Sequence, residues 1–286
     1  MASPAVDLAA YRDAVARLVE PISTSGALDE RHIRDWLAIP EVTQLLSAVP
    51  GGVEGVAGSL TEELRWYWHP AHRCTSRQSP SAWLRIYLLS RIDALWWNST
   101  PEFQTDAEVL AAEGLAEIHQ LRRSGRLHFS YHRLPRGLPG RARDWAYRRL
   151  LPARRPRTAG LKLTWVRPEM LIALNHLALE FKRAAPAGTP PMWVTSMVRS
   201  VEEQHELRAL GYPAFVPSSH SSGYAFDVEV HWFARFGART TLIDLLCEYQ
   251  RAGAINAIDE GHVWHVCLSP DAVAETRRSD TFALEV

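Results

Sequence analysis

The chain of 286 residues has few cysteines, no net charge and no long apolar run. Its 3 cysteines form no closely spaced pair, which argues against a disulfide framework and against a thiolate metal site. Lysine plus arginine and aspartate plus glutamate each number 32, so the chain as a whole has no electrostatic attraction to nucleic acid or anionic membranes. No stretch is long and apolar enough to span a bilayer, and the first residues lack the basic start and apolar core of a signal peptide. We therefore expect a cytoplasmic protein with reduced thiols and no transmembrane segment, unless export or release uses a route that the sequence does not show.

Apolar residues are plentiful, at 47% of the chain with 11 tryptophans, so a sizeable core can form. In the first part, apolar positions recur at helical spacing in residues 5–20, 28–48, 80–97 and 105–123. A Pro/Arg-rich break at 152–160 follows, and beyond it helical segments alternate with short strand-like ones, notably 193–199, 225–230 and 263–268. We predict an α+β protein with a helical N-terminal region at 1–155. The second domain, at 160–286, is predicted to have a mainly antiparallel sheet flanked by helices.

Two histidines and an aspartate in the second domain are spaced like metal ligands. His220 and Asp227 lie in the run Ser-Ser-His-Ser-Ser-Gly-Tyr-Ala-Phe-Asp, and His265 lies in the later run Val-Trp-His-Val-Cys. Two imidazoles and one carboxylate suit a catalytic Zn²⁺, because three protein ligands leave a fourth position open for water or substrate. A structural zinc site is normally closed by four ligands, often with cysteine among them. Either histidine alone would be taken as an ordinary one, but the spacing favours a metal site.

These runs resemble the zinc peptidases of the D-Ala-D-Ala carboxypeptidase/dipeptidase type. Their signature is Ser-x-His-x-x-Gly-x-Ala-x-Asp, followed later by a Trp-His pair. The first part is matched in full, by Ser218, His220, Gly223, Ala225 and Asp227, and the pair by Trp264 and His265. Arg199 is similar to the arginine with which the family binds a substrate carboxylate or the polarised carbonyl. The resemblance covers about residues 160–270. It implies a zinc metallopeptidase, a hydrolase whose substrates are small D-amino-acid peptides or peptidoglycan fragments of the bacterial cell wall.

The general base is the position at which the chain departs from this pattern. The family usually carries an acid three residues before the last histidine, and here that residue is His262. The nearest carboxylates are those of Asp259 and Glu260. Because side chains alternate along a strand, Glu260 and His265 would face opposite sides of a regular one, so a break is needed, which Gly261 could supply. We favour Glu260 as the base.

Two alternatives remain at this point. His262 is the second candidate for the base, since the pKa of histidine lies near neutrality. If neither residue serves, the domain is a catalytically inactive, zinc-containing module that binds peptides or cell-wall fragments.

Residues 133–157 contain nine arginines and a single acid, Asp144, with Trp145 and Tyr147 among them. Such a segment could bind a polyanion, for example nucleic acid or an anionic wall polymer. Because the chain as a whole is neutral, we favour a solvated helix face and a linker, and expect no nucleic-acid partner. A helical first half that binds a partner and delivers the zinc domain is a weaker alternative.

Overall fold

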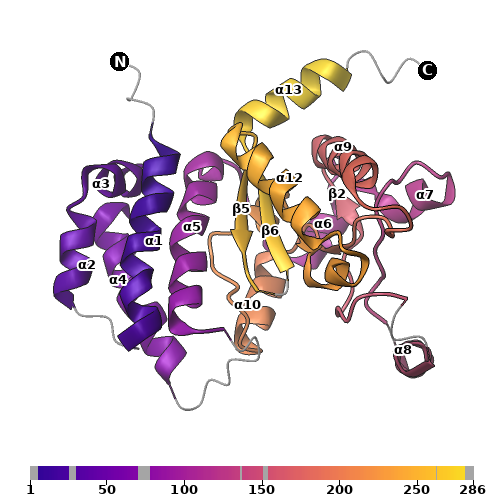
Figure 1. The fold of residues 1–286 in the computed structure, drawn as a ribbon, viewed down its shortest axis with the longest axis horizontal. Coiled ribbons are helices and arrows are strands. Elements are labelled where there is room, and N and C mark those ends of the chain that lie inside the picture. The colour runs from indigo at the N-terminus through magenta and orange to yellow at the C-terminus, as the bar shows by residue number, and fades with distance from the viewer. Residues whose placement is uncertain are drawn as a thin grey trace. The chain divides into compact units, whose positions relative to one another are not determined.

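The computed structural model describes residues 6–25, 30–69, 78–135, 137–150, 154–261 and 263–280. Sequence predictions that fall on residues 1–5, 26–29, 70–77, 136, 151–153, 262 or 281–286 lie outside these ranges. The described part confirms the predicted α+β class: helices precede a region with two small antiparallel sheets (Figure 1). No helix in the described ranges combines the length and the apolar character that crossing a bilayer requires.

The chain divides into two compact units that differ from the predicted boundary at 155–160. The first unit comprises Met1–Glu102 and Val201–Ser219, and the second comprises Phe103–Ser200 and His220–Val286. Apolar contacts explain the difference, since Val109 and Leu115 are buried in one cluster with Leu163 and Val198. The Pro/Arg-rich break at 152–160 therefore marks a change in local sequence pattern. Residues 103–135 precede this break but pack within the second unit, which contains the main sheet.

The first unit is helical. Its helices are α1 (Leu8–Ser25), α2 (Glu30–Leu37), α3 (Pro40–Ser47), α4 (Gly52–Trp68), α5 (Pro80–Trp97) and α10 (Val201–Ala209). Helix α5 forms as predicted, because the Ser79 side chain accepts a hydrogen bond from the Ala82 amide at 3.1 Å and Pro80 occupies the first turn. It is buried on several sides, at Trp83, Leu88 and other apolar positions, and α1, α3 and α4 pack on it.

The second unit contains the main sheet. Its helices are α6 (Asp106–Ala111), α7 (Ile118–Arg123), α8 (Gly137–Leu150), α9 (Pro168–Ala184), α12 (Arg239–Arg251) and α13 (Pro270–Asp280), with the 3₁₀ helix η1 (His231–Phe236). Strands β3 (Val194–Ser196), β4 (Ala225–Glu229), β6 (Val263–Leu268) and β5 (Ile255–Asp259) form one antiparallel sheet in this order. A second, two-stranded sheet pairs β1 (Ala116–Glu117) with β2 (Trp165–Val166).

Strand β4 is buried along its whole length at the middle of the main sheet. By alternation, Phe226 and Val228 project to one face while Asp227 and Glu229 project to the other. Buried carboxylates need partners of opposite charge or hydrogen-bond donors. The polar face of β4 is therefore where a functional site is expected, and the partners of Asp227 define it.

Candidate metal centre

One row of residues crosses the main sheet and contains two of the three predicted ligands. Ser196 on β3 pairs with Asp227 on β4, Asp227 pairs with His265 on β6, and His265 pairs with Ile258 on β5. Directly opposite residues of antiparallel strands project to the same face. The strand register thus brings Asp227 and His265 together although 38 positions separate them in the chain.

The third ligand, His220, is carried by a short helical turn immediately before β4. This turn, α11 (Ser219–Ser222), ends at Gly223, whose φ of +83° lets the chain reverse into the strand. A Cβ at this position would lie 3.0 Å from Nε of Arg167, which donates a hydrogen bond to the Ser222 carbonyl at 2.8 Å. The backbone angle therefore favours glycine here, and an added Cβ would also require the Arg167 side chain to move.

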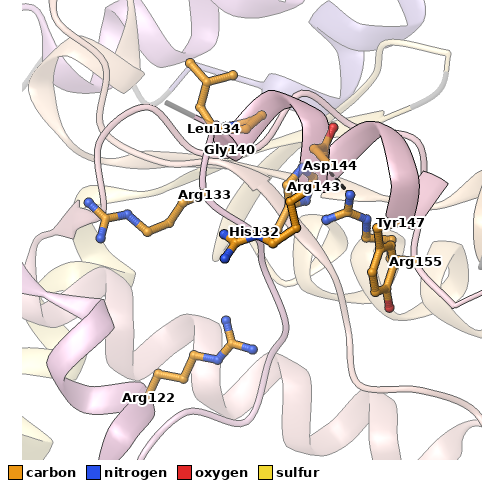
Figure 2. A pocket seen from close by; sticks show the side chains of 10 residues that line it. Arg122, His132, Arg133, Leu134, Gly140, Arg143, Asp144, Tyr147 and Arg155 are labelled. Atoms are coloured by element: carbon orange, nitrogen blue, oxygen red, sulfur yellow. Dashed lines mark hydrogen bonds and ion pairs between the residues drawn. The ribbon is translucent and has the colours of Figure 1, made fainter. Parts of the chain in front are cut away.

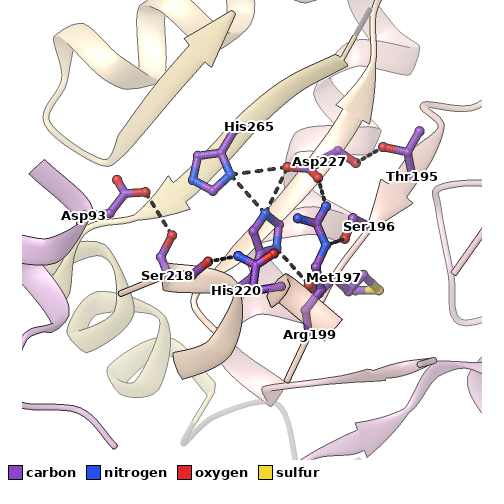
Figure 3. Close-up of polar contacts among 11 residues, drawn as sticks. Asp93, Thr195, Ser196, Met197, Arg199, Ser218, His220, Asp227 and His265 are labelled. Carbon is purple, nitrogen blue, oxygen red and sulfur yellow. Dashed lines mark hydrogen bonds and ion pairs between the residues drawn. The ribbon is translucent and has the colours of Figure 1, made fainter. Parts of the chain in front are cut away.

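The three side chains converge on one point with their ligand atoms in a small triangle (Figure 3). Asp227 Oδ1 lies 3.1 Å from His220 Nε2 and 3.2 Å from His265 Nδ1, and the two ring nitrogens are 3.0 Å apart. Bonds of about 2.0 to 2.1 Å in a tetrahedral zinc site separate the ligand atoms by about 3.3 Å. All three residues are buried. The group could hold a metal ion, and its atoms have the types and spacing that such an ion needs.

The protonation state of His220 suits a metal ligand. Its Nδ1 lies 2.8 Å from the Met197 carbonyl oxygen and donates its hydrogen there, which directs the lone pair of Nε2 into the triangle. Burial lowers the pKa of His220 to about 4, with a further contribution from the charge of Arg199. The imidazole is therefore neutral near pH 7, as metal binding requires.

Asp227 supplies the negative charge of the site. Burial by itself would raise the pKa of its carboxyl, but His220 and Arg199 outweigh this effect and hold the pKa well below its usual range. The carboxylate is thus ionised near neutral pH. It offers one oxygen, Oδ1, to the two histidines, while the other oxygen, Oδ2, is engaged by Arg199.

Arg199 lies beside the ligand triangle. Its Nη2 forms an ion pair with Asp227 Oδ2, and its Nε donates to Ser196 Oγ at 2.6 Å. Its backbone amide also bonds to the His220 carbonyl at 3.3 Å, so this residue connects two of the ligands. Outer contacts of this kind fix the orientation of a metal-ligating carboxylate. The structure thus places Arg199 in the site, while a contact with substrate stays a prediction.

Glu260 lies in the turn between β5 and β6. Its amide donates to the Val263 carbonyl at 3.0 Å, which continues the ladder by one pair beyond Asp259 and Trp264. Gly261, with φ of +89°, lies in this turn, so Glu260, just after β5, and His265, on β6, stand on opposite arms of one hairpin. Because Glu260 stands opposite Val263, alternation puts it on the same face as His265. His262, the other predicted base, lies outside the described residues, and both roles stay predictions.

Sequence reasoning missed two groups that support the ligands, the Ser196 hydroxyl and the Met197 carbonyl. Both lie at the end of β3, where the register against β4 shifts between Val194 and Ser196. Such an irregularity has no local sequence signal. The alternation of side chains along a strand therefore could not identify these two groups as partners of the ligands.

Glu229, next on the same face of β4, accepts a hydrogen bond from the Trp232 amide at 3.0 Å and so binds the start of η1.

No family model matches the chain, and comparisons with curated proteins and with solved structures find no match either. The site is therefore defined by its own geometry. Within the described part of the chain, His220, Asp227 and His265 are the group of histidine, cysteine and acidic ligand atoms that lie within 4.8 Å of one another. This coincidence of a sequence motif with a converging, buried ligand set is the basis for assigning a function.

Proposed function

We propose that the protein is a zinc-dependent peptidase that hydrolyses short D-amino-acid-containing peptides of the peptidoglycan type. The observation that carries this proposal is the triangle of His220 Nε2, Asp227 Oδ1 and His265 Nδ1, with edges of 3.0 to 3.2 Å. Three protein ligands leave one coordination position open, as catalytic zinc sites do. The choice of zinc and of the substrate class comes from the resemblance of the motif to D-Ala-D-Ala carboxypeptidases and dipeptidases.

In this proposal, the ligand residues hold the metal and Arg199 supplies a fixed positive charge beside it. When bound, the metal supplies Lewis acidity toward the scissile carbonyl and toward a water molecule. His220 and His265 would each provide a ring nitrogen, and Asp227 would partly balance the charge of the ion. Arg199 keeps Asp227 oriented through Oδ2, and its fixed positive charge favours a substrate carboxylate or a developing oxyanion nearby.

Proton transfer falls to Glu260 in this proposal. Its position on the same face as His265 lets a carboxylate accept the proton of the attacking water and pass it to the leaving amine. The carboxylate would then be ready for another turnover once the products leave. His262 remains the second candidate for this role.

A second candidate function is a zinc-containing module that binds peptides or wall fragments without cleaving them. The observation that favours it is the histidine at 262, where the resemblance calls for an acid. Binding needs the metal, the neutral histidines and the charge of Arg199, but it needs no general base. The two candidates therefore differ at one step, proton transfer, and share the metal centre.

Hydrolysis of D-Ala-D-Ala and of an acylated tripeptide ending in D-Ala-D-Ala tests the proposal. Released D-alanine is measured with the full-length protein, after chelation, and after zinc is restored. We expect D-alanine release that chelation abolishes and added zinc restores.

Glu260→Gln should retain the metal and lose hydrolysis, because the amide keeps the shape but cannot accept a proton. Glu248→Gln removes an exposed carboxylate on α12 and is the matched control, with full activity expected.

The results separate the candidates. Peptides that bind without being cleaved, in a zinc-dependent manner, would replace the peptidase by the binding module. Activity that survives Glu260→Gln would exclude Glu260 as the base and leave His262 to be tested by substitution. Neither binding nor cleavage by the zinc-loaded protein would reject this substrate class.

A further inference from the structure

A cavity with strongly basic walls lies in the second unit, formed by residues that the proposed peptidase chemistry does not use. Its volume is about 530 Å³, and its lining includes Arg122, His132, Arg133, Arg143, Tyr147 and Arg155. Figure 2 shows Arg122 on one side of the cavity and Arg155 with Tyr147 on the other. The four arginines come from α7, from the extended segment after Phe129, from α8 and from the segment after it.

The backbone beneath the cavity is held by hydrogen bonds. The Leu161 amide donates to the His132 carbonyl at 2.9 Å, and the Leu134 amide donates to the Leu161 carbonyl at 2.8 Å. Gly160, with φ of +97°, allows this approach, since a Cβ there would lie 2.8 Å from the carbonyl carbon of Arg133. The segment that carries His132 and Arg133 is therefore fixed before any ligand arrives.

Two of the four guanidinium groups are positioned by neighbouring side chains. Arg155 forms an ion pair with Asp144 and lies over the Tyr147 ring, with its Cζ 4.3 Å from the centroid. Arg122 donates to the Tyr131 carbonyl at 3.4 Å and lies 5.3 Å above the ring of the same residue. These contacts restrict the directions of both side chains at the cavity.

The other two lining arginines, Arg133 and Arg143, differ from Arg155 in their charge environment. Within the described part of the chain, neither Arg133 nor Arg143 forms an ion pair, and Asp144 is the one acid among the described lining residues. Like charges gathered around one space repel each other, and the repulsion weakens when an anion enters. Arginine is also the side chain whose planar fork matches phosphate oxygens in pairs.

We propose that this cavity binds a small anion with two or more phosphate groups, of the pyrophosphate or nucleoside diphosphate class. Its volume lies within the range of small-molecule pockets, about 300 to 1,000 Å³. Leu134 and Pro135 add apolar lining beside the cations, where an uncharged part of such a ligand fits. A long polyanion is the poorer match, because the chain as a whole is neutral and the basic groups gather around one pocket of small-molecule size.

Calorimetric titration of the full-length protein with pyrophosphate tests this proposal. The protein is first treated with chelator, so that a metal ion at His220, Asp227 and His265 cannot contribute phosphate binding. We expect saturable binding that Arg133→Ala with Arg143→Ala weakens by about tenfold or more, since two paired phosphate contacts are lost. Arg143→Lys should also weaken binding, because lysine keeps the charge without the planar fork.

The matched control is Arg141→Ala with Arg149→Ala. It removes the same charge from exposed positions on α8 that are not among the lining residues. We expect its affinity to stay within about twofold of the parent, because neither side chain lines the cavity and charges exposed to solvent are screened by salt. Thermal unfolding confirms that each variant is folded.

Three results would overturn the proposal. The first is no binding at millimolar pyrophosphate, and the second is an equal loss of affinity in the control and the cavity variant. The third is that the protein binds a single-stranded oligonucleotide more tightly than pyrophosphate, and that both double substitutions weaken oligonucleotide binding equally. This result would make the basic segment at 133–157 a surface for nucleic acid.

Discussion

In the candidate metal centre, two of the three ligand residues each use one of their two polar side-chain atoms to contact a residue outside the ligand set. His220 has its Nδ1 engaged by the Met197 carbonyl, and Asp227 has its Oδ2 engaged by Arg199. The remaining atoms, His220 Nε2 and Asp227 Oδ1, are the ones that meet His265. Contacts outside the ligand set thus select the tautomer of the histidine and the orientation of the carboxylate. Substitutions that change one atom while keeping the shape are accordingly the most informative at this scale.

The first prediction concerns the pH dependence of stability in the metal-free protein. Burial lowers the pKa of His220 from 6.5 to about 4, so the unfolded chain takes up a proton below pH 6.5 while the folded chain does not. The free energy of unfolding should therefore fall by about 2 to 3 kcal/mol between pH 6.5 and 4.5 because of this residue. Asp227, whose pKa is lowered in the fold, stays ionised in this interval and does not offset the loss.

Urea unfolding of the chelated protein at the two pH values measures this effect. His220→Asn keeps a donor for the Met197 carbonyl but does not titrate, so it should lose distinctly less stability between pH 6.5 and 4.5. The same pH dependence in the parent and the variant would show that His220 is not held neutral by the fold.

Arg199→Lys is predicted to separate catalysis from metal binding. Lysine keeps a positive charge beside Asp227 but cannot reach both Ser196 Oγ and Asp227 Oδ2 with a planar fork. We expect kcat/KM for a D-Ala-D-Ala peptide to fall by about tenfold or more, with zinc content unchanged. Arg183→Lys, at an exposed position on α9, is the control. Full activity of the Arg199 variant would limit this residue to a structural role.

At the scale of elements, the site is built by two turns and one strand register. Gly223 turns the chain from α11 into β4, and Gly261 turns it from β5 toward β6. Between these turns, the register of β4 against β6 sets Asp227 opposite His265. The ligand geometry therefore tolerates no shift of one residue in this pairing, because a shift would move His265 to the other face.

Gly223→Ala is predicted to destabilise the protein more than Gly188→Ala. Both positions have φ near +84°, so an alanine is strained by about 1 kcal/mol in either one. At Gly223 the added methyl also lies 3.0 Å from Arg167 Nε, whereas at Gly188 nothing lies within 4 Å. We expect at least about 1 kcal/mol of additional loss, measured by urea unfolding, and weaker metal binding. Equal losses would show that Arg167 adjusts without cost.

Local sequence patterns predicted where strands lie better than they predicted which residues contact one another. The strands expected at 225–230 and 263–268 are observed at Ala225–Glu229 and Val263–Leu268, because alternation and length are local properties. The helical spacing noted over 28–48 corresponds to two helices in the described residues, α2 and α3, since Pro40 begins α3 after an extended Ile39.

The candidate ligands could be recognised from their spacing in the chain. Their supports at Ser196 and Met197 could not, because these depend on a register irregularity between distant strands. Glu260 illustrates the same limit, since its face follows from the hairpin register and not from its offset along the sequence.

At the scale of the whole molecule, the two compact units are not successive segments of the chain. Residues 201–219 belong with the first unit although they lie between β3 and β4 in sequence. Residues 103–135 belong with the second unit, through the pairing of β1 with β2 and the bridge between Ser130 and Trp193. The Trp193 bridge is next to β3, which carries the supports of the ligands. A cut at the predicted boundary therefore divides the second unit.

A fragment of residues 159–286 is predicted to bind zinc at least about tenfold more weakly than the full chain, although it contains all three ligands. It lacks β1, the buried Val109 and Leu115, and the segment that pairs with Trp193. Competition with a zinc indicator measures both affinities. An affinity equal to that of the full chain would restore the boundary at 155–160 as a functional one.

The central claim, a metal centre formed by His220, Asp227 and His265, is tested most directly by the zinc content of the purified full-length protein and its ligand variants. The account predicts about one zinc per parent chain, because three ligands converge on a single site. His220→Asn, Asp227→Asn and His265→Ala should each lose most of it while remaining folded. A zinc content that is unchanged in the folded His220→Asn protein, or no zinc binding by the parent chain, would contradict the claim.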